Sequence, residues 1–411
     1  MGSRTSLAGK RRIDDLALFG GPPAFPETLH VGRPNIGSST ALVSHLRKML
    51  RRRWLTNYGP VVQQFERRIA ELVGVDHCVA VCNATLGLQV VGKALALVGE
   101  VVVPAFTFVA TPHAFRWVGI EPVFCDVDLT SHNLDPADVS ACLSSRTAAI
   151  VGLHCWGQPC PVPELEELAR RRSVPLIFDA AHAFGCQLGR RPVGSFGNAE
   201  VFSFHATKFV NSFEGGAITT SDPHLARELR LLINFGFRGY DDVATLGTNA
   251  KMSEIHAAMG LVSLDYMERI VLHNRRNYAA YRRSLAHLPG IQVRELFPSG
   301  HGNYQYVVVE LDPLHCPLSR DSLLAILHAE GVLARRYFSP GCHRMEPYVS
   351  RVTPPPRPLP NTDLLVQRVL QLPTGTAVSL IDIARIAELI AFALDHGEEI
   401  RARLGAEQRL S

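Results

Sequence analysis

The feature that most constrains the fold is a regular alternation of helical patterns and short apolar runs between residues 61 and 180. Helical periodicity over 61–75 and 84–97 is followed each time by an apolar run, over 77–83 and 100–106. Further helices are expected over 111–119, 135–143 and 163–173, and further strands over 121–127, 147–155 and 174–180. Strands this uniformly apolar are buried on both faces, which predicts a mainly parallel sheet covered by helices.

The pattern changes after residue 198. Strand patterns over 199–206 and 215–221 have too few residues between them for a helical crossover, so we expect an antiparallel or hairpin-like step there. A long helical pattern over 251–288 follows, and the last third of the chain is mixed and includes an amphipathic segment over 380–405.

These patterns predict an α/β protein with a smaller α+β part at its C-terminal end. We expect a flexible N-terminal tail over 1–28, a large α/β domain over 29–270 and a small α+β domain over 271–411. A chain of 411 residues, 46% of them hydrophobic, is long enough to bury a large core.

Composition narrows the partners and the location. The chain has 42 Lys and Arg against 38 Asp and Glu, which argues against the dense basic surface of a nucleic-acid-binding protein. No apolar run is long enough for a membrane span. Nine cysteines lie in apolar surroundings without a CxxC pair, which predicts reduced core residues in a cytoplasmic protein. We therefore expect small-molecule substrates, with neither nucleic acid nor membrane as a partner.

Two ionisable residues follow apolar strands of the predicted sheet. Asp179 comes at the end of "VPLIFD", and Ser203, His205 and Lys208 follow the next strand. Ligands of open α/β sheets bind outside the carboxyl ends of the strands, so these side chains are expected to converge. A turn cap is the alternative for a lone Asp, and a solvated ammonium is the alternative for a lone Lys.

Together, an amine and an acid at such an edge indicate a particular chemistry. In a partly desolvated pocket the neutral amine of Lys208 becomes accessible and can form a Schiff base with an aldehyde. A carboxylate across the pocket can keep a pyridine nitrogen protonated, which makes the ring an electron sink. Asp179 and Lys208 thus make sense as a pair around pyridoxal 5'-phosphate.

The motifs that carry these two residues resemble a known family. "FDAAHAFG" (178–185) and "FSFHATKFVNSFEGGAITT" (202–220) are similar to motifs of the DegT-type aminotransferases, fold-type-I pyridoxal-phosphate enzymes that act on nucleotide-linked keto sugars. Further motifs in the family's order are "RPNIG" (33–37), "NYGPVVQQFE" (57–66), "NATLGL" (83–88), "VVVPAFTFVAT" (101–111), "EPVFCDVD" (121–128), "GTNAKMSEIHAAMG" (247–260) and "RRYFSPGCH" (335–343). The resemblance covers nearly everything after the tail and implies a mixed, mainly parallel sheet flanked by helices.

The resemblance also implies roles for residues around the cofactor. Lys208 would bind it covalently and then carry the proton between two carbons, Asp179 would pair with the ring nitrogen, and His182 would lie beside the ring hydroxyl, where many relatives have Gln. The other implied cofactor-binding residues are Ala84, Thr85, Phe108, Ser203 and Asn249. For His182 and Phe108, core packing is the alternative. Ala84 departs from the family's usual glycine.

The family's reaction is a half-transamination in two stages. L-glutamate gives its amino group to the cofactor, and the resulting pyridoxamine 5'-phosphate form aminates a keto sugar. The motif around Lys208 resembles the subgroup that aminates C4 of dTDP-4-keto-6-deoxy-D-glucose (EC 2.6.1.33). The implied substrate-binding residues are Arg33, Asn57, Tyr58, His205, Tyr337 and His343. Asn249 would reach the phosphate from a neighbouring subunit, which implies a homodimer with shared active sites.

Four alternatives compete with this hypothesis. Members that aminate C3 tend to read Tyr-Pro-Gly-Lys, which this chain lacks, and a related branch that dehydrates sugars has His in place of Lys208. A non-catalytic binding or regulatory module would predict loss of the Lys and Asp pair. A metallo-hydrolase would need His residues at ligand spacing, and the chain has no HxxxH or HxH cluster, so no metal is expected.

Overall fold

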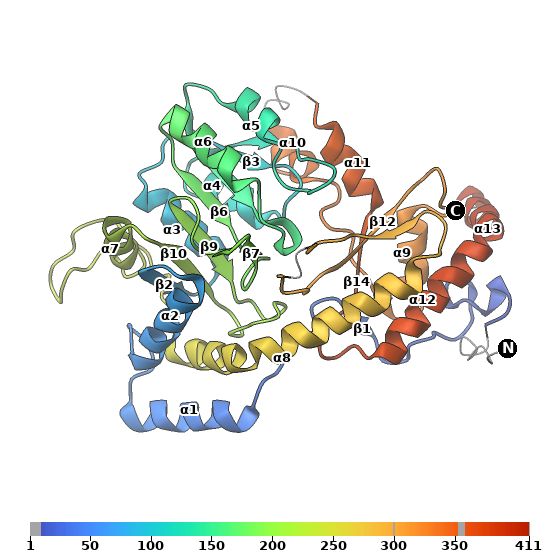
Figure 1. The fold of residues 1–411 in the computed structure, drawn as a ribbon, viewed down its shortest axis with the longest axis horizontal. Helices are drawn as coiled ribbons and strands as arrows, with labels where there is room; N and C mark the ends of the chain where they lie inside the picture. Colours follow the sequence, from blue (N-terminus) through green and yellow to red (C-terminus); the bar gives the residue numbers. More distant parts are fainter. Residues whose placement is uncertain (1–9, 299–300, 352–357, 411) are drawn as a thin grey trace.

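The computed structural model describes residues 10–298, 301–351 and 358–410 and is built around a seven-stranded sheet (Figure 1). In spatial order its strands are β2 (His77–Val81), β10 (Gly216–Thr220), β9 (Ala199–Ser203), β6 (Leu176–Asp179), β5 (Thr147–Leu153), β3 (Glu100–Pro104) and β4 (Glu121–Cys125). Neighbours from β9 to β4 pair in parallel, whereas β10 is antiparallel to both β9 and β2. The predicted α/β fold and its antiparallel step are both confirmed.

Helices cover both faces of this sheet, as its apolar strands require. The helices concerned are α2 (Pro60–Val73), α3 (Ala84–Ala94), α4 (Ala110–Trp117), α5 (Pro136–Cys142), α6 (Val162–Arg172) and α7 (Pro223–Leu232). Alternate residues of β3 belong to two separate apolar clusters: Val102 packs with the core that contains α2, α5 and α6, whereas Val101 and Val103 pack with α3, α4 and α7. The strands are therefore buried on both sides.

A smaller antiparallel sheet lies in the C-terminal part of the chain. Its strands are β11 (Ile291–Val293), β12 (Val307–Leu311) and β14 (Val369–Leu372), packed with α9 (Arg320–Ala329) and α12 (Leu380–Asp395). The helix α8 (Glu254–Leu285) runs from the main sheet to this part (Figure 1). The predicted domain boundary at residue 270 falls within α8, and the division into domains stays a prediction.

The remaining elements are short or peripheral. They are α1 (Ser39–Arg52), α10 (Tyr348–Arg351), α11 (Pro360–Arg368), α13 (Gly397–Leu410), β7 (Gln187–Leu188), β8 (Arg191–Pro192), and the 3-10 helices η1 (Ile13–Asp15), η2 (Ala17–Phe19), η3 (Cys155–Gly157) and η4 (Cys342–Arg344). In the described part of the chain, no helix combines the length and the apolar character that a membrane crossing requires. All nine cysteines are thiols, and all but Cys82 are buried.

The N-terminal segment is packed from residue 10 onward. Lys10 Nζ lies 2.8 Å from the Glu330 carboxylate, and both side chains are buried. Glu330 also accepts the backbone N–H groups of Ala17 and Ala24, so its charge is fully satisfied. Strand β1 (Leu29–His30) then pairs with β13 (Val332–Leu333). Residues 10–28 thus differ from the loosely held tail that the sequence predicts, whereas residues 1–9 lie outside the described part.

Candidate active site

A cavity of about 760 Å³ opens at the carboxyl ends of β6 and β9. Nine of the predicted site residues line it: Ala84, Thr85, Phe108, Asp179, His182, Ser203, His205, Lys208 and Tyr337. The cavity also takes side chains from the C-terminal part, including Gln305, Tyr306 and Arg335. The parallel strands therefore bring together residues that are far apart in the sequence, as expected from their strand ends.

Asp179 places a carboxylate inside this cavity. It accepts a hydrogen bond from the hydroxyl of Thr111 at 2.6 Å and another from the N–H of Ala181 at 3.0 Å. Burial raises the pKa of Asp179, while these two hydrogen bonds and the charge of Lys208 act in the opposite direction. A cationic group bound against this carboxylate would relieve the cost of its burial.

Lys208 places an amine in the same cavity. Its Nζ donates a hydrogen bond to the hydroxyl of Tyr306 at 3.1 Å. Burial lowers the pKa of Lys208 to about 8, against the opposing effect of the Asp179 charge. Near neutral pH, a useful fraction of this amine is therefore unprotonated and able to attack an aldehyde.

His182 is a buried imidazole with a defined tautomer. Its Nδ1 accepts the backbone N–H of Trp156 at 3.3 Å, and its ring is stacked with those of Trp156 and Phe338. Burial, helped by the charge of Lys208, lowers the pKa of His182 well below its usual value. The ring is therefore neutral, and because Nδ1 is an acceptor, the proton is on Nε2. The residue can act as a hydrogen-bond donor in the cavity.

The N-terminus of α3 supplies an anion site at the cavity wall. Asn83 caps this helix by accepting the N–H of Leu86 at 2.8 Å. The N–H groups of Ala84 and Thr85 have no partner within the helix, and the helix dipole favours a negative charge there. Alanine supplies the same backbone donor as the glycine of relatives. A Cβ at Gly216 would lie 2.8 Å from the nitrogen of Ala84, so the glycine keeps this approach open.

These features fit pyridoxal phosphate. The carboxylate of Asp179 suits the ring nitrogen, and the neutral imidazole of His182 can donate to the ring hydroxyl. The amine of Lys208 suits the aldehyde, and the N-terminus of α3 suits the phosphate. Phe108, with 55% of its surface exposed, lies at the cavity wall and is free to stack on a ring.

Five predicted residues do not line the cavity: Arg33, Asn57, Tyr58, Asn249 and His343. His343 Nε2 lies 3.1 Å from the Asp363 carboxylate, and the Tyr58 ring packs against the guanidinium of Arg230. Asn249 forms a β-bridge with Asn234. Their assignment to substrate or cofactor stays a prediction, which for Asn249 concerns a neighbouring subunit.

Other residues of the site are missed by the sequence analysis. Thr111 and Tyr306 contact Asp179 and Lys208 directly, and Trp156 positions His182. Neither Tyr306 nor Trp156 lies in a motif that the sequence analysis singles out. Of these residues, only Thr111 could have been linked to the site from the sequence, because its hydroxyl lies at the start of a predicted helix that follows a predicted strand.

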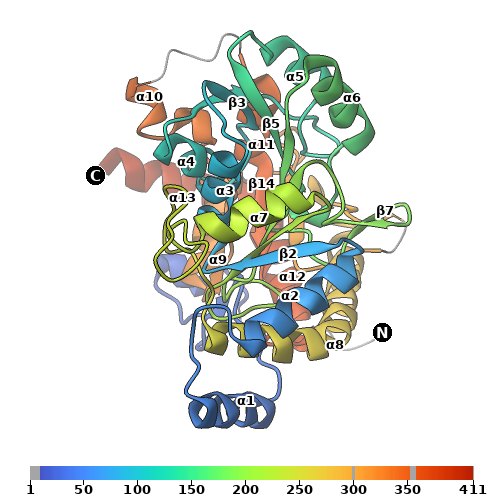
Figure 2. The same cartoon turned by 90° about the vertical axis from the view of Figure 1, so that its left-hand side faces the viewer.

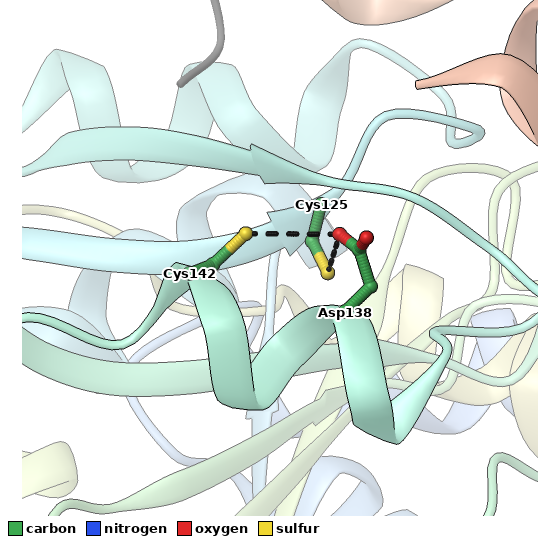
Figure 3. A group of neighbouring side chains, drawn as sticks. All are labelled: Cys125, Asp138 and Cys142. Atoms are coloured by element: carbon green, nitrogen blue, oxygen red, sulfur yellow. Dashed lines mark hydrogen bonds between the residues drawn. The ribbon is translucent and has the colours of Figure 1, made fainter. Parts of the chain in front are cut away.

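A group of two thiols and a carboxylate lies outside the cavity (Figure 3). Asp138 Oδ2 accepts hydrogen bonds from Cys125 Sγ at 3.0 Å, from Cys142 Sγ at 3.7 Å and from the N–H of Asp126 at 2.9 Å. Among the described residues, no fourth ligand of these types joins the group. These hydrogen bonds join the end of β4 to α5.

Comparisons with known proteins agree on one family. Residues 39–391 match the model of the DegT/DnrJ/EryC1/StrS aminotransferase family. A dTDP-4-amino-4,6-dideoxy-D-glucose transaminase of Escherichia coli is 32% identical over 371 residues, which is 89% of this chain and 98% of that protein. A crystal structure of DesI with its TDP-sugar product superposes with a TM-score of 0.92 at 52% identity, covering 95% of this chain and 99% of DesI. A ketimine complex of DesV from S. venezuelae gives a TM-score of 0.79 at 28% identity, covering 86% and 94%.

Proposed function

The chain belongs to the DegT/DnrJ/EryC1/StrS aminotransferase family, and we propose that it transfers the amino group of L-glutamate to C4 of dTDP-4-keto-6-deoxy-D-glucose. It is a sugar-nucleotide aminotransferase, and the enzymes of its family depend on pyridoxal phosphate. The observation that carries the proposal is the presence of Asp179 and Lys208 in one cavity. Amination at C4 is supported by the E. coli relative, which is named for a 4-amino sugar, and by the motif around Lys208.

The cavity residues would bind the parts of the cofactor and move a proton as follows. The N–H groups of Ala84 and Thr85, with the hydroxyl of Ser203, would bind the phosphate. Asp179 would keep the ring nitrogen protonated, and His182 would donate its Nε2–H to the ring oxygen. When bound, pyridoxal phosphate supplies an aldehyde and an electron sink. Lys208 would bind it through Nζ and, once released, use the same nitrogen to take a proton from one carbon and return it to another.

The sugar assignment is tested by the mass of the product. The loaded enzyme is incubated with nitrogen-15-labelled L-glutamate and dTDP-4-keto-6-deoxy-D-glucose, and the nucleotide sugar is analysed by mass spectrometry. We expect the label in the sugar, with the carbonyl oxygen replaced by an amino group. The 3-keto isomer is the matched comparison. Labelling of that isomer alone would support amination at C3, and an unlabelled product from both would contradict the proposed function.

We also propose a homodimer with shared active sites. Helix α1 packs against α8 and lies at the outer edge of the molecule in both ribbon views (Figures 1 and 2). Val43 and Leu50 on it, and Trp54 and Leu55 just after it, are exposed. Apolar side chains gathered in this way mark a surface that a second copy can cover.

Mixing two inactive variants tests the sharing. Lys208→Ala and Asn249→Asp are each expected to be inactive, because the first lacks the amine and the second sets a carboxylate against the phosphate. After subunit exchange, a mixed dimer has one site with both native residues, so activity should recover to about a quarter of the wild-type value. Sedimentation equilibrium establishes that dimers are present. If exchanged dimers stay inactive, Asn249 does not cross the interface.

A further inference from the structure

Tyr306 lies next to the reacting amine and has no assigned role. It immediately precedes β12 and reaches the cavity from the C-terminal part of the chain. Its hydroxyl lies 3.1 Å from Nζ of Lys208, and this is its one hydrogen bond within the described residues. Only 7% of the surface of Tyr306 is exposed, so its neighbours hold most of the side chain in place.

The ring of Tyr306 is fixed by two aromatic neighbours from the segments that follow β6 and β5. Its centroid lies 4.7 Å from that of His182 and 5.5 Å from that of Trp156, and the Trp156 contact is nearly edge-to-face at 70°. Rings in such contacts lose little further freedom when they form a hydrogen bond. The hydroxyl is therefore a pre-positioned partner for the amine of Lys208.

A phenol suits an amine that changes its protonation state. The hydroxyl can accept a hydrogen bond from an ammonium group and can donate one to a neutral amine. Burial raises the pKa of Tyr306 well above its usual value, so the phenol keeps its proton throughout. The phenol can thus hold Lys208 before and after the lysine takes up a proton, and it neither gains nor loses a proton itself.

We propose that Tyr306 holds the free amine of Lys208 in place during the stages in which the lysine is not bonded to the cofactor. The contact is made by Nζ of Lys208, the same nitrogen that would act as the base. This inference rests on the proposed function for the role of Lys208. The contact between Tyr306 and Lys208 itself is independent of the cofactor.

A variant that removes only the hydroxyl tests the contact in the cofactor-free protein. Tyr306→Phe keeps the ring and its packing. The matched control is Tyr281→Phe, which removes a buried tyrosine hydroxyl that donates to Pro373 at 2.9 Å, outside the cavity. The readout is the pH dependence of Lys208 acetylation by acetic anhydride, measured by mass spectrometry of the peptide that contains Lys208.

We expect the acetylation midpoint to fall by about one pH unit in Tyr306→Phe, because a hydrogen bond from an ammonium is stronger than one from a neutral amine. Tyr281→Phe should keep the wild-type midpoint. If the Tyr306→Phe midpoint equals that of wild type, the proposed contact is overturned. Equal shifts in both variants would show a general effect of losing a buried hydroxyl and would overturn it as well.

The loaded enzyme provides a second readout. In Tyr306→Phe, the glutamate half-reaction followed by stopped-flow absorbance should slow by about 10–100-fold, because a misplaced base costs rates of this order. Glutamate deuterated at Cα should then show a larger isotope effect than in wild type. An unchanged rate and isotope effect would overturn the positioning role. If the wild type itself does not respond to glutamate, the proposed function fails, while the acetylation result still decides whether the contact exists.

Discussion

Replacement of Lys208 by alanine is expected to lower glutamate-dependent transamination by about four powers of ten or more, the upper range for loss of an acid–base group. The side chain is the amine that lies in the cavity beside Tyr306, with its pKa lowered to about 8. Wild-type enzyme with bound cofactor should lose its visible absorption band when glutamate is added. The Lys208→Ala protein should show no such response.

A charge-preserving variant separates the two properties of Lys208. Lys208→Arg keeps a cation near Asp179 but has no amine able to bond to an aldehyde, so it should be as inactive as Lys208→Ala. Activity in Lys208→Arg near the wild-type level would contradict the role of the amine.

The lowered pKa also predicts a pH dependence of cofactor capture. The neutral fraction of the Lys208 amine grows as the pH rises through about 8, so the rate at which cofactor-free protein binds pyridoxal phosphate should increase over that range.

The second large effect is expected for Asp179→Asn. An amide cannot supply the negative charge that keeps the ring nitrogen protonated. Breaking a buried ion pair costs about 3–5 kcal/mol, which corresponds to a loss of about two to four powers of ten in rate if the charge acts in the transition state. Single-turnover kinetics with glutamate measures this loss.

Stability measurements separate this effect from unfolding. Burial raises the pKa of Asp179, so in cofactor-free protein its charge lowers stability as the pH rises through its folded pKa. Asp179→Asn removes that cost and should not lower the melting temperature at neutral pH. The control is Asp126→Asn: Asp126 accepts the N–H groups of Asn361 and Thr362 at the start of α11, outside the cavity. Asp126→Asn should lose stability but keep the glutamate reaction. If Asp179→Asn shows that pattern instead, the proposed role of the Asp179 charge is contradicted.

The sequence predicts the half of the cavity that depends on strand order. Asp179 and Lys208 follow consecutive strands of a parallel sheet, and the position of such side chains is determined by topology. The antiparallel β10 is equally predictable, since the residues before it are too few for a crossover. The family resemblance adds Ala84, Thr85 and Phe108, which line the same cavity.

The other half depends on tertiary contacts that no local pattern reports. Tyr306 has the sequence context of a buried strand, and only the placement of the C-terminal part brings it to Lys208. Trp156 adopts a positive φ of 59°, which no propensity predicts for a bulky residue. Lys10 has the sequence context of a charged tail, yet its amine pairs with the buried carboxylate of Glu330. Arg33 and His343 belong to motifs shared with the family, yet neither residue lines the cavity.

The cavity is lined by residues from distant parts of the sequence, and a ribosome makes these parts at different times. The helix N-terminus at Ala84, the acid at 179 and the amine at 208 emerge first, and the walls at 306 and 335 follow much later. The backbone of Arg335 pairs with Gln371 of β14, so this wall cannot be fixed before β14 has been made. In a nascent chain, the side chain of Lys208 is therefore made well before β14 can complete the cavity around it.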